Sequence, residues 1–145
     1  MNTENSSDFR FPISDLARAA AGMMSRAYAP YSGYTVGAAL LCSDGTVFTG
    51  CNIENASFTP TVCAERTAIF KAVSEGHRDF VAIAVAGGKN GKLEGAFPPC
   101  GVCRQVMAEF CPPDFPVYVV TGEGEYEKYT LAQLLPLGFG PAYMK

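Results

Sequence analysis

Two segments of the sequence determine the fold: Thr61-Val62-Cys63-Ala64-Glu65-Arg66 and Pro98-Pro99-Cys100-Gly101-Val102-Cys103-Arg104. The first places a cysteine two residues ahead of a glutamate, and the second is a C-x-x-C pair preceded by prolines. A catalytic zinc ion takes three protein ligands and keeps a fourth position for water, and thiolate sulfur is a good ligand for it. The pattern therefore predicts a zinc site held by Cys63, Cys100 and Cys103, with the rest of the chain as its scaffold.

Both segments have the features of helix N-termini. Thr61 is a candidate N-cap ahead of Cys63, and Pro98 and Pro99 precede a run, 102–110, with helical apolar spacing. A helix N-terminus carries partial positive charge, which lowers the pKa of a thiol and favours the metal-binding thiolate. We therefore expect the three cysteines to lie at the starts of two helices.

Glu65 and Arg66 follow the first candidate ligand directly. Glu65 is too close to Cys63 along the backbone to be assumed a fourth ligand, so we assign it the role of general base and acid. Three thiolates on one divalent zinc give the site a net negative charge, which works against lowering the pKa of a bound water. We expect Arg66 to offset that charge by donating hydrogen bonds to ligand sulfur. The alternative is that Arg66 and Arg104 are both surface cations.

The apolar runs outside these two segments predict the strands of a sheet. An Asp-Gly turn at 44–45 is expected to join two of them into a hairpin. A continuous apolar run at 80–86 suits a buried central strand, and the glycine-rich segment 87–92 after it is expected to be a loop. The expected strands are 34–41, 46–51, 80–86, 117–121 and 126–129.

Four helices are expected to cover this sheet. The first is capped by Ser14 and ends before Pro30, and the last is short and begins with a capping box formed by Thr130 and Gln133. The two between them span 62–75, with Gly76 as C-cap, and 100–110. Together the elements predict an α/β fold of three layers, α/β/α, around a mixed five-stranded sheet. We expect one domain over 13–145 and a disordered N-terminal tail over 1–12.

The composition favours a small, uncharged substrate. The chain has 145 residues, a net charge of −3 and no basic patch. Polynucleotide binding draws much of its affinity from Lys and Arg side chains that meet phosphates, so we expect no nucleic-acid partner. Residues 1–11 are polar, and no apolar stretch is long enough to span a membrane. We therefore expect no membrane partner and a cytoplasmic location.

The six cysteines could form disulfides, but in a chain without an export signal a C-x-x-C pair is more typical of metal binding. Cys42, Cys51 and Cys111 lie in or beside apolar runs, and we expect them to be small buried hydrophobes. A closed structural zinc site would need a fourth Cys or His. His77 is the single histidine and lies a helix length from Cys63, so we expect it to be a solvated loop residue.

Five motifs along the chain match one known family. They are Tyr28-Ala29-Pro30-Tyr31-Ser32, Val36-Gly37-Ala38-Ala39-Leu40, Asn52-Ile53-Glu54-Asn55-Ala56, Cys63-Ala64-Glu65-Arg66 and Cys100-Gly101-Val102-Cys103-Arg104-Gln105. These motifs closely resemble the small homotetrameric cytidine deaminases, members of the cytidine and deoxycytidylate deaminase superfamily of zinc enzymes. The resemblance covers about residues 16–141. It implies one zinc ion per chain and a homotetramer whose active sites are completed by neighbouring subunits.

The resemblance also implies the substrate contacts. Asn52 and Glu54 would hold the ribose hydroxyls, the backbone N–H of Ala64 would bind the pyrimidine O2, and Tyr34 would stack near the base. Phe139 resembles a C-terminal aromatic that reaches a neighbour's active site; its alternative role is an intrachain anchor for the end of the chain. On local sequence alone, Asn52 could equally be a turn residue and Glu54 a solvated carboxylate.

The expected activity is hydrolytic deamination of cytidine and 2′-deoxycytidine to uridine and 2′-deoxyuridine with release of ammonia, a step of pyrimidine salvage. Zinc-activated water would attack C4 of the pyrimidine while Glu65 protonates N3 and then passes a proton to the leaving amine. The alternatives are deamination of a modified cytosine nucleoside or a nucleoside antibiotic such as blasticidin, deamination of a single-stranded polynucleotide, and a non-enzymatic zinc-stabilised module. Asn52 and Glu54 favour a ribose over the antibiotic, and a polynucleotide would need a basic channel.

Overall fold

The computed structural model of the chain describes residues 11–144, so residues 1–10 of the expected N-terminal tail lie outside the described part. Five strands form one sheet in the order β2-β1-β3-β4-β5. They are β1 (Tyr34–Cys42), β2 (Val47–Cys51), β3 (Phe80–Lys89), β4 (Pro116–Gly122) and β5 (Glu125–Thr130). Only the β3/β4 pair is parallel, and the other pairs in this sheet are antiparallel. The sheet is therefore mixed, as predicted.

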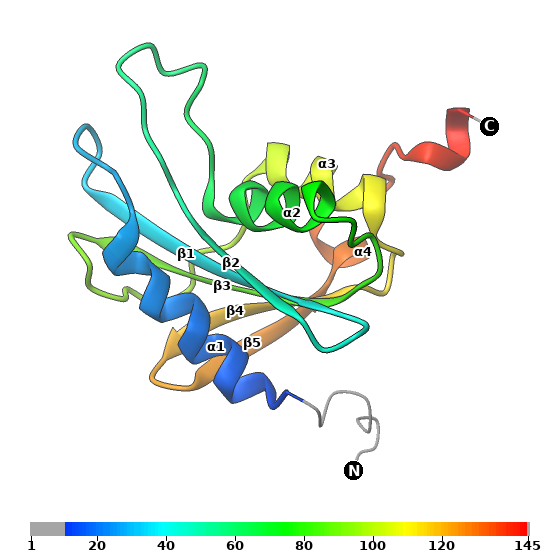
Figure 1. Cartoon of the computed structure of the whole chain (residues 1–145), viewed down its shortest axis with the longest axis horizontal. Helices are drawn as coiled ribbons and strands as arrows, with labels where there is room; N and C mark the ends of the chain where they lie inside the picture. Colours follow the sequence, from blue (N-terminus) through cyan, green and yellow to red (C-terminus); the bar gives the residue numbers. More distant parts are fainter. Residues whose placement is uncertain (1–10, 145) are drawn as a thin grey trace.

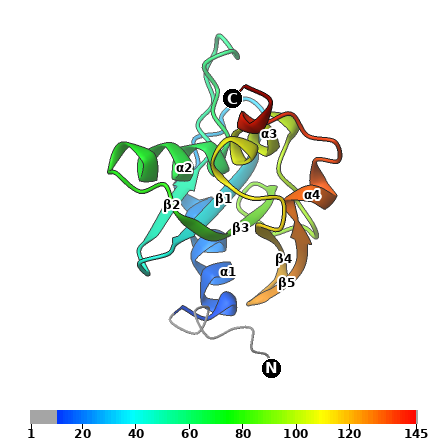
Figure 2. The ribbon, with the colours of Figure 1, turned by 90° about the vertical axis from the view of Figure 1, so that its right-hand side faces the viewer.

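Helices cover both faces of the sheet (Figures 1 and 2). They are α1 (Ile13–Gly22), α2 (Ala64–Ser74), α3 (Gly101–Phe110) and the short α4 (Leu131–Leu134), with 3-10 turns η2 (Met23–Arg26) and η3 (Pro141–Met144). The helix α1 packs on one face, and α2 and α3 pack on the other. This arrangement confirms the predicted three-layer α/β/α class. None of the helices in residues 11–144 has the length and apolar character needed to cross a bilayer.

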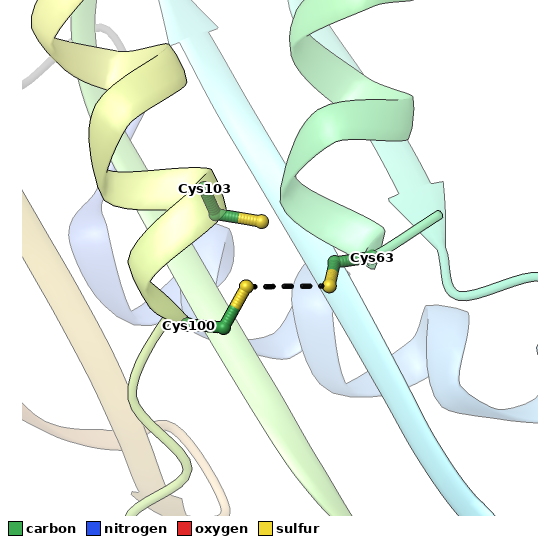
Figure 3. Close-up of side chains that lie close together, drawn as sticks. All are labelled: Cys63, Cys100 and Cys103. Carbon is green, nitrogen blue, oxygen red and sulfur yellow. Dashed lines mark hydrogen bonds between the residues drawn. The ribbon is translucent and has the colours of Figure 1, made fainter. Parts of the chain in front are cut away.

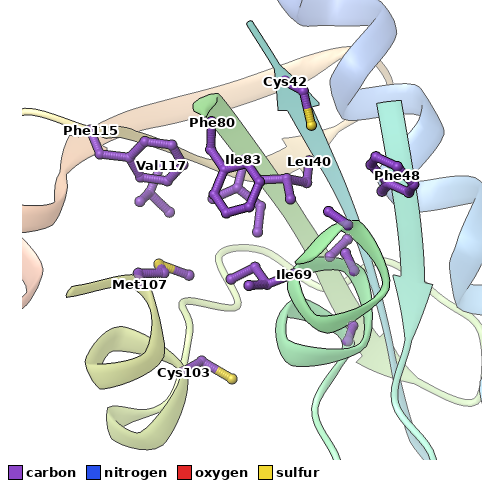
Figure 4. Close-up of a cluster of buried hydrophobic side chains, with 14 of the residues drawn as sticks. Leu40, Cys42, Phe48, Ile69, Phe80, Ile83, Cys103, Met107, Phe115 and Val117 are labelled. Carbon is purple, nitrogen blue, oxygen red and sulfur yellow. The ribbon is translucent and has the colours of Figure 1, made fainter. Parts of the chain in front are cut away.

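The side-chain alternation of β1 supplies both cores, because successive residues of a strand point to opposite faces. Ala39 and Leu41 pack against α1, whereas Leu40 packs in the cluster beneath α2 and α3. Figure 4 shows this second cluster, in which Ile69 of α2 and Met107 of α3 meet the strands. Burying these side chains fixes the two helices on the sheet and therefore fixes where each helix starts.

The six cysteines are free thiols in this structure, as expected if none of them forms a disulfide. Cys42 is buried, and Cys51 and Cys111 are half-buried. Cys103 is fully buried and belongs to the core cluster beneath α2 and α3. One of the predicted metal ligands is therefore packed as a core residue.

The expected start of the first helix is wrong. Ser14 lies inside the first turn of α1 and does not cap it, because the helix begins directly after Pro12. The carbonyl of Pro12 accepts hydrogen bonds from the N–H groups of Asp15 (3.0 Å) and Leu16 (3.1 Å). The fixed φ of proline suits a helix start without a side-chain cap. The predicted capping box of the last helix, Thr130 with Gln133, is confirmed.

The expected loop at 87–92 is also partly wrong, because β3 continues through Lys89. The following segment folds back over the glycines of this strand. A Cβ atom at Gly88 would lie 1.8 Å from the carbonyl oxygen of Lys92, and one at Gly87 would lie 2.5 Å from the ring of Phe97. Gly88 is therefore needed for a close approach of two backbone segments and Gly87 for a close approach of the Phe97 ring, and neither is needed for a turn.

Candidate active site

Cys63 and Cys100 occupy the N-cap positions of α2 and α3. Their backbones are extended, with φ −80° and ψ 159° for Cys63 and φ −71° and ψ 170° for Cys100. The expected N-cap, Thr61, lies two residues too early, and its Oγ1 atom instead accepts a hydrogen bond from the N–H of Asn55 (3.0 Å). Both sulfur atoms therefore stand at the positive ends of helix dipoles.

The sulfur atoms of Cys63, Cys100 and Cys103 point toward one another (Figure 3). All three Sγ atoms lie within 4.8 Å of one another, and those of Cys63 and Cys100 are 3.6 Å apart. Tetrahedral zinc with Zn–S bonds of about 2.3 Å separates its ligand sulfurs by about 3.8 Å. The three cysteines therefore fit zinc. His77 pairs with Asp44 instead of joining this group (Nε2–Oδ2 3.1 Å), and its side chain is half-buried, not solvated.

The thiols do not ionise independently. The pKa of Cys63 is lowered to about 5, because the thiol of Cys103 donates a hydrogen bond to its sulfur and Arg66 donates another. The pKa of Cys103 is raised, because its proton is held by Cys63 and because the thiol is buried. One thiolate is therefore stable in the cluster without a metal, and binding a divalent cation would release the remaining protons.

Glu65 lies in the first turn of α2 with only 3% of its surface exposed. Burial raises the pKa of its carboxyl group to about 7; a backbone hydrogen bond opposes this shift and the negative charge of Cys63 adds to it. A group with a pKa near the working pH both accepts and donates protons readily. The position and pKa of Glu65 therefore suit proton transfer beside the cysteine cluster.

The two arginines differ in what they contact. The Nη2 atom of Arg66 donates to the Sγ atom of Cys63 (3.4 Å), while its buried Nε atom has no hydrogen-bond partner among the described residues. Arg104 contacts backbone oxygen instead: Nε donates to Pro99 (2.7 Å) and Nη1 to Leu134 (2.6 Å). Both arginine side chains are half-buried. The alternative interpretation, that both are surface cations, is therefore wrong.

Asn52 follows β2 and is 9% exposed. Its Oδ1 atom accepts from the N–H of Val36 (2.8 Å), and its Nδ2 atom donates to the carbonyl of Tyr34 (2.8 Å). The side chain therefore links the end of β2 to the start of β1 and is not a simple turn residue. Because a primary amide has two N–H donors, one remains for a substrate.

Glu54 is held as an ionised carboxylate. Its Oε1 atom accepts from the N–H groups of Tyr31 (2.9 Å) and Ser32 (3.1 Å), and its Oε2 atom accepts from the hydroxyl of Ser32 (2.5 Å). The Ser32 hydroxyl is the largest cause of a lowered pKa at Glu54. These residues line a cavity of about 400 Å³ with Phe58 and Thr61. No role of Ser32 is predicted from the sequence, where its place in the first matching motif is the signal for it.

Tyr34 begins β1, and its ring meets two side chains that sequence reasoning missed. It stacks on Phe97 (centroids 5.7 Å apart, interplanar angle 30°), and the Nζ atom of Lys89 lies 5.0 Å from its centroid. Lys89 pairs with Tyr34 in the β1/β3 register, and Phe97 lies three residues ahead of Cys100. The aromatic pair therefore lies next to the segment that leads to the second ligand group.

Phe139 lies on the C-terminal segment beyond α4. Its backbone oxygen accepts a hydrogen bond from the Nε2 atom of Gln105 (2.8 Å). The residue is 56% exposed, and its ring stacks on Tyr143 (centroids 5.1 Å apart). The ring is thus available on the surface, next to α3.

The chain matches the family described as "Cytidine and deoxycytidylate deaminase zinc-binding region" over residues 12–119. It belongs to this deaminase family. It is 54% identical over 114 residues to a cytidine deaminase of Sporosarcina psychrophila, a match that covers 79% of this chain and 81% of the relative. A cytidine deaminase of Halalkalibacterium halodurans is 56% identical over 113 residues, covering 78% of this chain and 83% of the relative.

Solved structures of deaminases share the fold. A crystal structure of cytidine deaminase from Burkholderia pseudomallei superposes with a TM-score of 0.77 and 46% sequence identity, covering 86% of this chain and 96% of that one. Membership of this zinc-binding deaminase family confirms the predicted fold class and the predicted cofactor, zinc. Among residues 11–144, the group of side chains that can hold the ion is Cys63, Cys100 and Cys103.

Proposed function

We propose that this protein deaminates cytidine and 2′-deoxycytidine to uridine and 2′-deoxyuridine with release of ammonia, as in pyrimidine salvage. The observation that carries the proposal is the buried carboxyl group of Glu65, two residues after Cys63 of the cysteine cluster. Relatives named cytidine deaminases, at 54% and 56% identity, support the substrate. A cytoplasmic location stays a prediction from the sequence.

Glu65 moves the protons of this reaction. When bound, zinc supplies the Lewis-acid chemistry that makes water a nucleophile near neutral pH. The Glu65 carboxylate takes a proton from the attacking water and gives it to N3 of the pyrimidine as C4 becomes tetrahedral. It then takes the remaining proton from the new C4 hydroxyl and gives it to the amino group, so that the C4–N bond breaks, ammonia leaves and the C4 carbonyl forms. A pKa of about 7 lets one carboxyl group serve as base and acid in turn.

Groups at the start of α2 support this chemistry. Arg66 stabilises the thiolate of Cys63 by its hydrogen bond to Sγ. We assign the N–H of Ala64 to the pyrimidine O2, because the first N–H groups of a helix have no acceptor within the helix. Substrate oxygen would thus meet a positive helix end on the same turn that presents Glu65.

Sugar and base binding is assigned to residues on the neighbouring loops. The ionised carboxylate of Glu54 accepts from a ribose hydroxyl, and the remaining N–H of Asn52 donates to one. Tyr34, stacked on Phe97, is placed against the base. The anchored geometry of all three side chains supports these roles, since a positioned group loses little entropy on binding.

The proposed assembly is a homotetramer whose sites receive Phe139 from neighbouring subunits. The exposed apolar side chains of Phe58, Leu137, Phe139 and Tyr143 support a surface that meets another copy of the chain. The alternative role of Phe139, an anchor for its own chain, is supported by its stacking on Tyr143 and by the hydrogen bond from Gln105 to its backbone oxygen. Sedimentation velocity distinguishes the proposed tetramer from a monomer.

One relative suggests another class of substrate. The chain is 32% identical over 108 residues to a blasticidin-S deaminase of Bacillus cereus. Purified protein should therefore be given cytidine, 2′-deoxycytidine, blasticidin S and a cytosine-containing oligonucleotide in parallel. We expect the highest kcat/KM with the two nucleosides. A higher value with either of the other substrates would contradict the proposed function.

A further inference from the structure

The first turns of α3 carry two metal ligands and also contact the C-terminal segment, residues 134–144. Cys103 is followed directly by Arg104 and Gln105. The Nη1 atom of Arg104 donates to the carbonyl of Leu134 (2.6 Å), and the Nε2 atom of Gln105 donates to the carbonyl of Phe139 (2.8 Å). Two consecutive side chains after a ligand thus hold the backbone of the C-terminal segment.

Arg104 also contacts the other side of the metal group. Its Nε atom donates to the carbonyl of Pro99 (2.7 Å), the residue before Cys100. One half-buried guanidinium therefore joins the backbone ahead of a metal ligand to the backbone at the end of α4. Hydrogen bonds from a charged donor are roughly twice as strong as neutral ones, so this bridge is strong for a contact between segments.

Leu134 and Leu135, at the start of this segment, pack against the core beneath α2 and α3, whereas the part that follows, 136–144, has little apolar packing within the chain. A cavity of about 520 Å³ separates it from the end of α3 and is lined by Ala108, Phe110, Leu135, Phe139 and Tyr143, among others. Leu137 is fully exposed. Figure 1 shows the segment extending away from the sheet beyond α3 and α4. A segment with few buried apolar contacts opens easily, so within one chain the order of 136–144 depends largely on the hydrogen bond from Gln105.

We propose that zinc binding and the ordering of the C-terminal segment are coupled through Arg104 and Gln105. The cation fixes the first turn of α3 through Cys100 and Cys103, and that turn fixes the segment. Coupling between two sites is reciprocal, so the ordered segment also raises the affinity for zinc by the same factor. Arg104 and Gln105 are positioning residues in this scheme.

The consequence for activity rests on the function proposed above. If Phe139 completes a neighbour's site, a subunit that loses zinc also withdraws Phe139 from that neighbour. Activity would then fall more steeply than the fraction of zinc-loaded chains. The contacts that carry the coupling, those of Arg104 and Gln105, lie within one chain, so the coupling is measured without substrate.

The first test is hydrogen–deuterium exchange of the full-length protein with and without zinc. Exchange of amides in 135–144 should be at least about fivefold faster in the zinc-free protein, the lower end of ordinary coupling between sites. Peptides from β5 serve as the internal reference for unfolding. Equal protection of 135–144 in both forms, with β5 protected in both, would overturn the proposal.

The second test is Gln105→Met, which keeps size and helix propensity and removes the donor to Phe139. Gln105 is exposed and contacts neither a ligand nor Pro99, so the variant should fold and keep its ligands. We expect faster exchange of 135–144 and about fivefold faster transfer of zinc to a chromogenic chelator. Arg104→Met should have a larger effect on both, and Arg18→Met on α1 should have none.

Unchanged zinc transfer from Gln105→Met would reject the coupling, whatever the activity of the protein. Conversely, a protein that shows the coupling but leaves cytidine unchanged would reject only the proposed function. The two failures are therefore separable.

Discussion

The Sγ atom of Cys63 lies 3.6 Å from the Sγ atom of Cys100, although 37 residues separate them in the chain. Each sulfur belongs to the N-cap residue of a helix, and both helices pack on the same face of the sheet. The metal group is therefore assembled by helix packing, with the third sulfur one turn into α3. Its integrity should depend on the sheet beneath it as much as on the cysteines.

The role of Glu65 predicts the behaviour of Glu65→Gln. This change keeps the shape of the side chain and removes its ability to carry a proton, so kcat should fall by about 10²–10⁴-fold while zinc per chain stays constant. Zinc analysis and the ultraviolet assay of cytidine give the two values. Glu75→Gln, at the exposed end of the same helix, is the matched control and should retain activity. Activity of Glu65→Gln within tenfold of wild type, about 1.4 kcal/mol, would remove Glu65 from the proton path.

The pH dependence of turnover follows from the same carboxyl group. Its pKa of about 7 means that the protonated form, which cannot accept a proton from water, increases below that pH. We expect kcat/KM to fall on the acid side with an apparent pKa at or below about 7, because a zinc cation beside the carboxyl group favours its ionised form. A profile measured from pH 4 to 9 checks this. A flat profile down to pH 4 would show that the group that must be ionised is not Glu65.

Stability should respond to pH through Glu65 in the zinc-depleted protein. Because burial raises the pKa of Glu65 from 4.5 to about 7, the folded state binds the extra proton. Its contribution is fully present below about pH 4.5 and is lost as pH rises through about 7. Glu65→Gln should therefore be more stable than wild type at pH 8, by on the order of 3 kcal/mol, and should lose that advantage at pH 4.5. Urea unfolding at both pH values measures the difference.

The titration of Cys63 opposes this trend in both proteins, and in wild type its negative charge also adds to the raised pKa of Glu65. Its pKa is lowered to about 5, so its contribution is present above the usual thiol pKa and is lost as pH falls through about 5. Wild type and Glu65→Gln both contain Cys63. A stability difference between them that does not change between pH 4.5 and 8 would contradict a buried Glu65 carboxyl group with a raised pKa.

The ligand assignment predicts different results for two thiols, the fully buried Cys103 of α3 and the half-buried Cys111 just after that helix. Cys103→Ser replaces a sulfur of the metal group and should lower zinc per chain and abolish most activity. Cys111→Ser changes a free thiol outside the group and should retain both. Zinc content after dialysis against a weak chelator compares the two variants. Equal zinc retention would exclude Cys103 as a ligand.

Gly50 of β2 lies against the start of α2, so a larger residue there should weaken zinc binding at the cysteine cluster. A Cβ atom at Gly50 would lie 2.5 Å from the carbonyl oxygen of Ala64 and 2.6 Å from the backbone nitrogen of Ala68. Gly50→Ala should therefore displace the start of α2, cost about 1–3 kcal/mol of stability and weaken zinc binding. Gly22→Ala, where nothing lies within 4 Å, is the control and should not destabilise the protein. Wild-type zinc affinity in Gly50→Ala would show that α2 tolerates the shift.

The grouping of the three cysteines and the order of the elements could be predicted from the sequence. Ligand spacing and apolar periodicity are local signals, and the C-x-x-C pair needs only one turn of helix to bring its sulfurs together. The end of the second helix was also predictable, because Gly76 adopts φ +91°, which glycine accommodates without strain.

Features that depend on tertiary contacts could not be predicted in this way. Thr61 was a reasonable N-cap, but its hydroxyl bonds to Asn55 and leaves the cap position to Cys63. The stacking of Phe97 on Tyr34 depends on the β1/β3 register and on the segment that folds over Gly87. None of these contacts has a signature in sequence spacing.

Zinc at the three cysteines and Glu65 should together deaminate cytidine. The decisive measurement is the ultraviolet absorbance of a cytidine solution mixed with purified protein whose zinc content has been measured in the same sample. We expect loss of the cytidine band, with uridine and ammonia as products, at about one zinc ion per chain. Protein that carries one zinc ion per chain and leaves cytidine unchanged would contradict it.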